Sequence, residues 1–74
     1  MIGYSLSTVK RNKAASIKNI GVRLGRIAIK KDVPVDEIAN HLGVSTVSVY
    51  AWFYGTYNPK PNIVDKLTKF LSRK

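Results

Sequence analysis

The chain has 74 residues, no cysteine and a formal net charge of +9. A chain this short forms one domain around a single core, which leaves no room for a substrate cleft on a separate scaffold. The lack of cysteine excludes disulfides and thiolate metal sites, and no stretch approaches the ~20 apolar residues of a membrane span. One histidine and four acidic residues form no cluster with metal-ligand spacing.

Positive charge gathers at the two ends of the sequence. Residues 1–31 contain eight Lys or Arg and no acidic residue, whereas residues 60–74 contain five basic residues and Asp65. Residues 32–59 contain no Lys or Arg, and their acidic residues are Asp32, Asp36 and Glu37. This distribution favours a polyanionic partner. The alternative is that the charges only keep a small domain soluble.

Residues 1–15 lack a sustained hydrophobic period. They predict a basic arm, mobile or weakly helical, that precedes a helical domain over residues 16–74. The first helix of this domain is predicted from an N-cap at Ser16 to about Lys31. Five apolar residues form one stripe along it, namely Ile17, Ile20, Leu24, Ile27 and Ala28.

Two further apolar residues of this helix, Val22 and Ile29, fall on the flank of the stripe and need a cover. Two sources are open. The cover comes either from the N-terminal Tyr4, Leu6 and Val9 or from a second subunit.

Two short helices joined by a tight turn are predicted next. Pro34 suits the first position of a helix that Gly43 ends by supplying a positive φ. Ser45 is expected to cap the following helix, 46–54, which stops at Gly55. A last helix over about 62–72 begins with Asn62 as its cap. Its apolar face consists of Ile63, Val64, Leu67, Phe70 and Leu71.

The segment 35–54 has the spacing of a helix-turn-helix. Its fifth, ninth, fifteenth and eighteenth places hold Ala39, Gly43, Val49 and Trp52. Two helices that cross at a steep angle need a small residue, a turn glycine and two buried apolar residues there. The predicted fold is therefore all-α, a compact bundle of four to five helices with a central helix-turn-helix.

With its flanking helices, this segment resembles the lambda-repressor and Cro family of helix-turn-helix domains. The resemblance covers about residues 19–71. It rests on Ile20-Gly21, Leu24, Ile38-Ala39, Leu42-Gly43-Val44-Ser45, Val49, Trp52 and Gly55. The resemblance implies a cytoplasmic transcriptional regulator that binds double-stranded DNA as a homodimer on a pseudo-palindromic operator. It implies neither enzymatic activity nor a cofactor, a membrane or a small-molecule ligand.

The same resemblance implies which residues contact DNA. Bases are read from the first turn of the helix 46–54 and from the next turn, which here hold Ser45, Thr46, Val47, Tyr50 and Ala51. The loop after this helix contacts phosphates, and its residues are Tyr54, Tyr57, Asn58 and Lys60. A basic arm that wraps the duplex would use Lys10, Arg11 and Lys13.

The chain departs from the family in two ways. Val35 replaces the glutamine that often begins the second helix, and the reading helix has no Arg, Lys, Gln or Asn. The strong bidentate pairings with guanine and adenine are then missing. Hydroxyls of Thr46, Ser48 and Tyr50 and methyl groups of Val47 and Ala51 remain. We expect an AT-leaning site with modest base discrimination that DNA shape assists.

Other interpretations of single residues and of the whole chain stay open. Tyr50 can instead pack on the first helix, Tyr54 and Tyr57 can cover the last helix, and Ser48 can bond to its own helix backbone. A helix-turn-helix can also serve as a protein-interaction module, such as an antitoxin or a DNA-packaging subunit. A membrane-binding amphipathic peptide is disfavoured because the first stripe is needed for the core.

Overall fold

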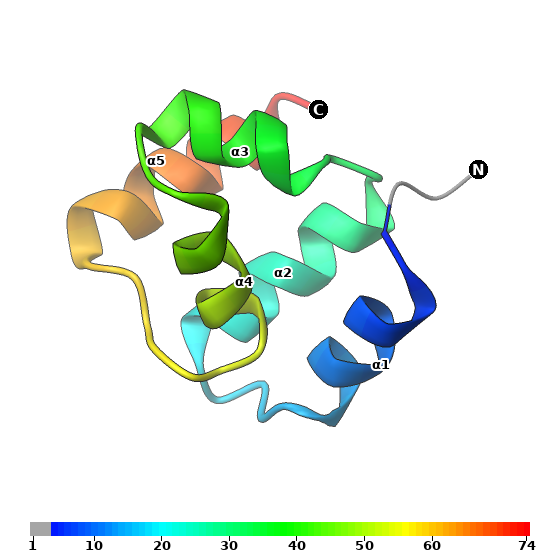
Figure 1. The fold of residues 1–74 in the computed structure, drawn as a ribbon. Helices are drawn as coiled ribbons and strands as arrows, with labels where there is room; N and C mark the ends of the chain where they lie inside the picture. Colours follow the sequence, from blue (N-terminus) through cyan, green and yellow to red (C-terminus); the bar gives the residue numbers. More distant parts are fainter. Residues whose placement is uncertain (1–3) are drawn as a thin grey trace.

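The computed structural model describes residues 4–74, and this part of the chain contains five α-helices and no strand (Figure 1). In chain order they are α1 (Leu6–Ala14), α2 (Ile20–Lys30), α3 (Val35–Leu42), α4 (Thr46–Phe53) and α5 (Pro61–Ser72). Helix α2 packs against α1, α4 and α5, and α3 packs against α4 and α5. The predicted all-α class is confirmed.

The N-terminal region contains a regular helix where the sequence predicted an arm. Ser5 caps α1, since its hydroxyl accepts a hydrogen bond from the Thr8 amide at 3.2 Å. The inward face of α1 is polar, because its buried residues are Thr8 and Asn12. The sequence of α1 therefore lacks an apolar period, although this helix packs against α2. Residues 1–3 of the predicted arm lie outside the described residues.

Helix α2 begins later than predicted, and its buried face keeps Ile20, Leu24 and Ala28 of the predicted stripe but is rotated away from Ile27. Its N-cap is Asn19 rather than Ser16, so Ile17 precedes the helix and is 53% exposed. Ile27 also lies at the edge and is 41% exposed, whereas Val22 is fully buried. Gly21 and Gly25 explain the rotation of the buried face. A Cβ at Gly21 would lie 2.7 Å from the Trp52 carbonyl oxygen, so the missing side chains let α4 approach.

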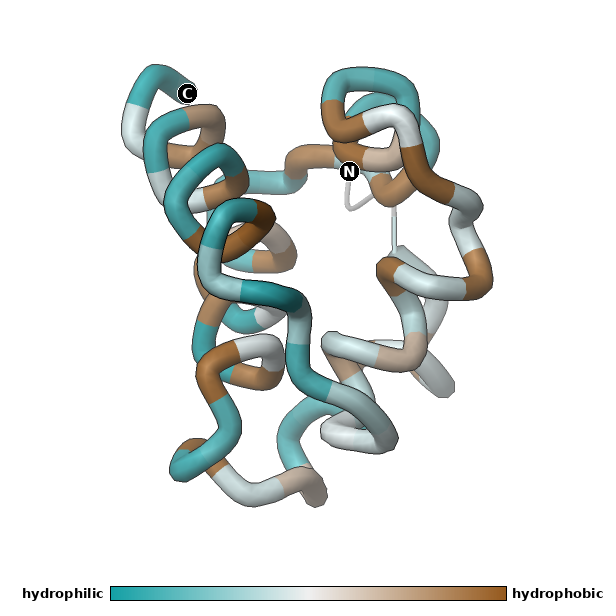
Figure 2. Tube along the Cα trace, turned by 90° about the vertical axis from the view of Figure 1, so that its left-hand side faces the viewer, coloured by the Kyte–Doolittle hydropathy of each residue, from teal (hydrophilic) through white to brown (hydrophobic). Residues whose placement is uncertain are grey.

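The core lies between α2, α4 and α5, with α3 closing one end. Its largest fully buried side chains include Phe53, Ile38, Leu67, Leu71 and Val22. Figure 2 shows hydrophobic and hydrophilic stretches alternating along the turns of the helices, as expected when each helix buries one face.

The flank of α2 receives its cover from the same chain. Tyr4 is buried, and Val9 and Ile29 are partly buried against the core, while Leu6 is 78% exposed and covers nothing. The intrachain cover is thus confirmed for Val9, which lines one groove with Ile29, while Tyr4 packs against Phe53. Val22 is fully buried within the chain, so it needs no second subunit as its cover.

Three residues connect α3 to α4. Gly43 ends α3 in the left-handed region at φ 70°, as predicted, and its amide donates to the Ala39 carbonyl. Ser45 caps α4, because its hydroxyl accepts from the Ser48 amide at 3.2 Å. The two helices pack against each other through Ala39 and Val49, which are 4% and 0% exposed. The predicted start and end residues of both helices are confirmed to within about one residue.

The last helix, α5, starts one residue earlier than predicted. Pro61 occupies its first turn and Lys60 is the N-cap, so Asn62 lies inside the helix and does not cap it. Gly55, with φ 79°, follows α4 and starts the loop that leads to α5.

Candidate functional site

The outward face of α4 is exposed and carries no charge. The inward face holds Val49, Trp52 and Phe53, all buried. On the opposite side Val47 is 75% exposed, and Tyr50 and Ala51 are partly exposed beside it. An exposed large apolar residue at a helix N-terminus has no role in the core. Val47 is among the residues that the sequence predicts to contact DNA, and the structure leaves its side chain accessible.

Hydroxyl groups surround the N-terminus of α4. The Ser45 and Ser48 hydroxyls lie 3.2 Å apart, and the Ser45 oxygen also holds the cap. Thr46 is half-buried at the first position of the helix. The Ser48 hydroxyl is therefore in contact with Ser45 of the same helix end. The outward face of α4 consists of Thr46, Val47, Tyr50 and Ala51.

A stack of side chains links the C-terminal turn of α4 to α1. The rings of Tyr50 and Tyr54 stack with centroids 5.8 Å apart, and the Arg11 guanidinium lies 3.9 Å from the centroid of the Tyr54 ring. The Tyr54 hydroxyl lies 3.2 Å from the Thr8 hydroxyl. A cation of α1 is thus held next to the outward face of α4, although nearly forty residues separate them in the sequence.

Asn12 fixes the position of α1 that makes this stack possible. Its side-chain amide donates to the Phe53 carbonyl at 2.7 Å and to the Val22 carbonyl at 3.2 Å. Phe53 is the last residue of α4, so its carbonyl has no partner within the helix. One buried amide, 1% exposed, therefore joins α1, α2 and α4.

The three predicted basic residues of α1 do not lie together. Arg11 lies on the flank that faces Tyr54, where a shallow hollow also includes Ala14, Ala15 and Thr56. Lys13 lies on the other flank and faces α2. Lys10 is exposed. The structure thus places Arg11, but not Lys13, beside α4.

The loop between α4 and α5 borders the same side of the molecule at its other edge. Tyr57 is 69% exposed, and its amide lies 3.4 Å from the Ala51 carbonyl that also receives the Thr56 amide. Asn58 and Lys60 are exposed, while Pro59 between them is buried and anchors the loop. Tyr57 does not cover α5 and leaves its ring in solvent.

Sequence reasoning missed Thr8 and Asn12 as positioning residues. A signal was present, because Thr8 and Asn12 lie four residues apart on one face of α1, and the buried Tyr4 precedes Thr8 by the same spacing just ahead of the helix. A search for apolar stripes passes over this face, since both of its helical side chains are polar.

Other kinds of site find no support in the described residues. Among residues 4–74 no group of three or more His, Cys, Asp or Glu side chains could hold a metal ion. No helix in this part of the chain is long and apolar enough to cross a membrane. Comparison with known proteins adds no assignment, since no family model, curated protein or solved structure matches the chain.

Proposed function

We propose that this protein is a helix-turn-helix DNA-binding regulator that inserts the outward face of α4 into the major groove. The observation that carries the proposal is the exposed, uncharged face of α4 with Val47 at 75% exposure, next to the basic side of α1. A helix that reads base edges has to project from its supporting helices, and flanking cations contact the phosphates.

The connection between α3 and α4 supports this assignment. A short turn with Gly43 in the left-handed region joins two helices that pack against each other, and the motif is built from such a pair. The N-terminus of α4 is open, and its first turn carries the cap hydroxyl of Ser45 and the exposed side chain of Val47. Helix N-termini also favour a nearby phosphate.

Phosphate contacts would come from two sides of α4. Arg11 lies at the C-terminal end of α4, and Lys60 with Tyr57 borders the loop that follows it. The net charge of +9 adds long-range attraction for a polyanion. We expect affinity to arise mainly from these contacts and to fall steeply as salt rises.

Base recognition would rest on small groups. Thr46 offers a hydroxyl and Val47 and Ala51 offer methyl groups, which suit the C5-methyl of thymine. Tyr50 stacks on Tyr54 and is partly buried against the core, so it would contribute less than Thr46, Val47 and Ala51. We therefore propose an AT-leaning half-site. Two copies would occupy half-sites about one helical turn apart on a pseudo-palindromic operator.

Selection from random-sequence DNA with the full chain tests the proposal. An enriched inverted repeat that is rich in A and T, bound with a steep salt dependence, is the expected result. Binding without an enriched motif would instead indicate an architectural role. The absence of binding at low salt would overturn the proposal and leave a protein-interaction module as the better account.

A further inference from the structure

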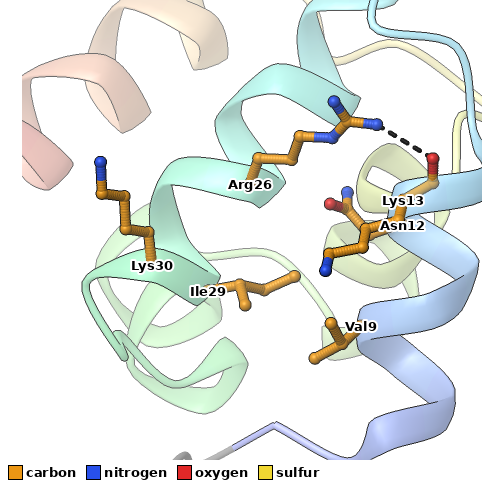
Figure 3. A pocket seen from close by; sticks show the side chains of 6 residues that line it. All are labelled: Val9, Asn12, Lys13, Arg26, Ile29 and Lys30. Carbon is orange, nitrogen blue, oxygen red and sulfur yellow. Dashed lines mark hydrogen bonds between the residues drawn. The ribbon is translucent and has the colours of Figure 1, made fainter.

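A groove of about 490 Å³ lies between α1 and α2, on the flank of α1 that faces away from Tyr54 (Figure 3). The residues that line it are Val9, Asn12, Lys13, Arg26, Ile29 and Lys30. Three of them come from α1 and three from α2. The volume is within the range of sites that bind small molecules.

The groove combines cationic side chains with an apolar floor. Lys13, Arg26 and Lys30 supply the positive charge, and no acidic residue lines the groove among the described residues. The ion pairs Asp65–Lys69 and Glu37–Lys74 lie outside α1 and α2. Figure 3 shows the Lys30 side chain pointing away from α1, so Lys13 and Arg26 are the two cations nearest to each other, and an anion between them would relieve the repulsion of their like charges.

Arg26 has an unsatisfied donor at this site. Its Nη2 donates to the Lys13 carbonyl at 3.0 Å and so caps the C-terminal turn of α1, as the dashed line in Figure 3 shows. Its Nε is buried and has no partner among the described residues. The buried Nε is out of reach of a ligand, so an anion in the groove would contact the terminal guanidinium nitrogens of Arg26, which form charge-assisted hydrogen bonds with carboxylates.

The apolar part of the groove is formed by one side chain from each helix. Val9 and Ile29 are partly buried, and Figure 3 shows them on the facing sides of α1 and α2. Their methyl groups suit an aliphatic chain better than a sugar–phosphate backbone. The groove also faces away from the stack of Tyr50, Tyr54 and Arg11, which separates it from the proposed DNA surface.

We infer that this groove binds a small amphiphilic anion, a medium-chain aliphatic carboxylate. Its carboxylate would contact Arg26 and Lys13, with Lys30 adding a more distant positive charge, and its chain would lie on Val9 and Ile29. This inference revises the expectation that the protein takes no small-molecule ligand. It does not depend on DNA binding, because the ligand site and its test require the protein alone.

Titration of the full-length, isotope-labelled protein with octanoate tests the inference by nuclear magnetic resonance. We expect saturable shifts in the amides of residues 9–13 and 26–30 and none of comparable size in α5. Octan-1-ol, which has the same chain but no charge, should bind at least about tenfold more weakly, since hydrogen bonds to charged groups are the stronger ones.

A pair of charge-matched double variants distinguishes a built site from general attraction. Lys13→Gln with Lys30→Gln should weaken octanoate binding about tenfold or more, whereas Lys18→Gln with Lys66→Gln removes the same charge from exposed positions outside the groove and should have little effect. Ile29→Asn provides a second test through the apolar floor, and circular dichroism checks that each variant is folded. Equal losses in both double variants, or shifts spread over the whole surface, would overturn the inference.

Discussion

Asn12→Ala tests the claim that one buried amide holds α1 in place. The substitution removes donors to the Phe53 carbonyl at 2.7 Å and to the Val22 carbonyl at 3.2 Å. Each lost hydrogen bond costs about 1 kcal/mol, and leaving the terminal carbonyl of α4 unpaired costs about 1–3 kcal/mol more. The higher helix propensity of alanine returns about 0.5 kcal/mol. We expect a net loss of about 3 kcal/mol in the free energy of unfolding.

Urea denaturation followed by far-ultraviolet circular dichroism measures this loss. A chain of this length has a total stability of roughly 4–11 kcal/mol, so a loss of about 3 kcal/mol shifts the midpoint clearly. Asn12→Asp keeps the volume but replaces the donors by acceptors beside two carbonyl oxygens, and should cost at least as much at neutral pH.

Asn40→Ala is the matched control, since Asn40 is exposed on α3. A surface change of this kind stays within about 0.5 kcal/mol. The reasoning is refuted if Asn12→Ala costs less than about 1 kcal/mol, because α1 would then not depend on this amide.

Three further predictions concern other parts of the molecule. Gly25→Ala should destabilise the protein by about 1–2 kcal/mol in the same urea assay, because its Cβ would lie 2.7 Å from Phe53 Cγ and the gain in helix propensity offsets only part of the strain. The control is Gly43→Asn, at an open position with φ 70°, which should cost much less. Equal losses in the two variants would contradict the close approach of α2 to Phe53. Burial raises the pKa of Tyr4, whose hydroxyl donates to the Val33 carbonyl at 2.5 Å, so the folded state keeps the proton that the unfolded state releases above pH ~10. The contribution of Tyr4 to the free energy of unfolding should therefore be constant below pH ~10 and fall above it. Tyr4→Phe should lose about 1 kcal/mol at neutral pH but lack this alkaline fall. Parallel pH profiles of the two proteins would contradict the role of Tyr4. Arg11→Gln should reduce the slope of log affinity against log salt for DNA by about 0.9, with exposed Arg73→Gln as control, and an unchanged slope would remove Arg11 from the phosphate contacts.

Local signals predicted α3 and α4 well. Gly43 and Ser45 act through backbone groups within four residues, namely a positive φ and a hydroxyl on the Ser48 amide, so the sequence alone contains the whole cause. The exposure of Val47 follows from the same helix, because Val49, Trp52 and Phe53 fix which side faces inward.

The position of α1 could not be predicted because its causes are distant in sequence. Thr8 and Asn12 bond to Tyr54 and Phe53, more than forty residues away, and neither is apolar. The buried face of α2 was predicted too far toward Ile27 for a related reason. Large apolar side chains dominate a helical stripe, whereas the closest packing in this protein takes place at Gly21 and Gly25, which contribute nothing to such a stripe.

The sequence could not show which of the proposed DNA-contacting residues share one surface. Lys10, Arg11 and Lys13 form one basic cluster along the chain, but a helix places neighbouring residues about 100° apart. Arg11 therefore lies against Tyr54 while Lys13 faces Arg26 across the groove. A cluster in sequence becomes two surfaces once α1 is helical.

Binding of a selected duplex by Val47→Glu tests the central claim most directly. Val47 is 75% exposed, and a glutamate in the first turn of α4 suits both helix propensity and the helix dipole, so the fold should be retained. Thr68→Glu adds the same charge on the exposed side of α5. We predict that Val47→Glu weakens binding at least about thirtyfold and Thr68→Glu less than about threefold, since only the first places a carboxylate against base edges and phosphates. Equal effects of the two variants would contradict the assignment of α4 as the reading helix.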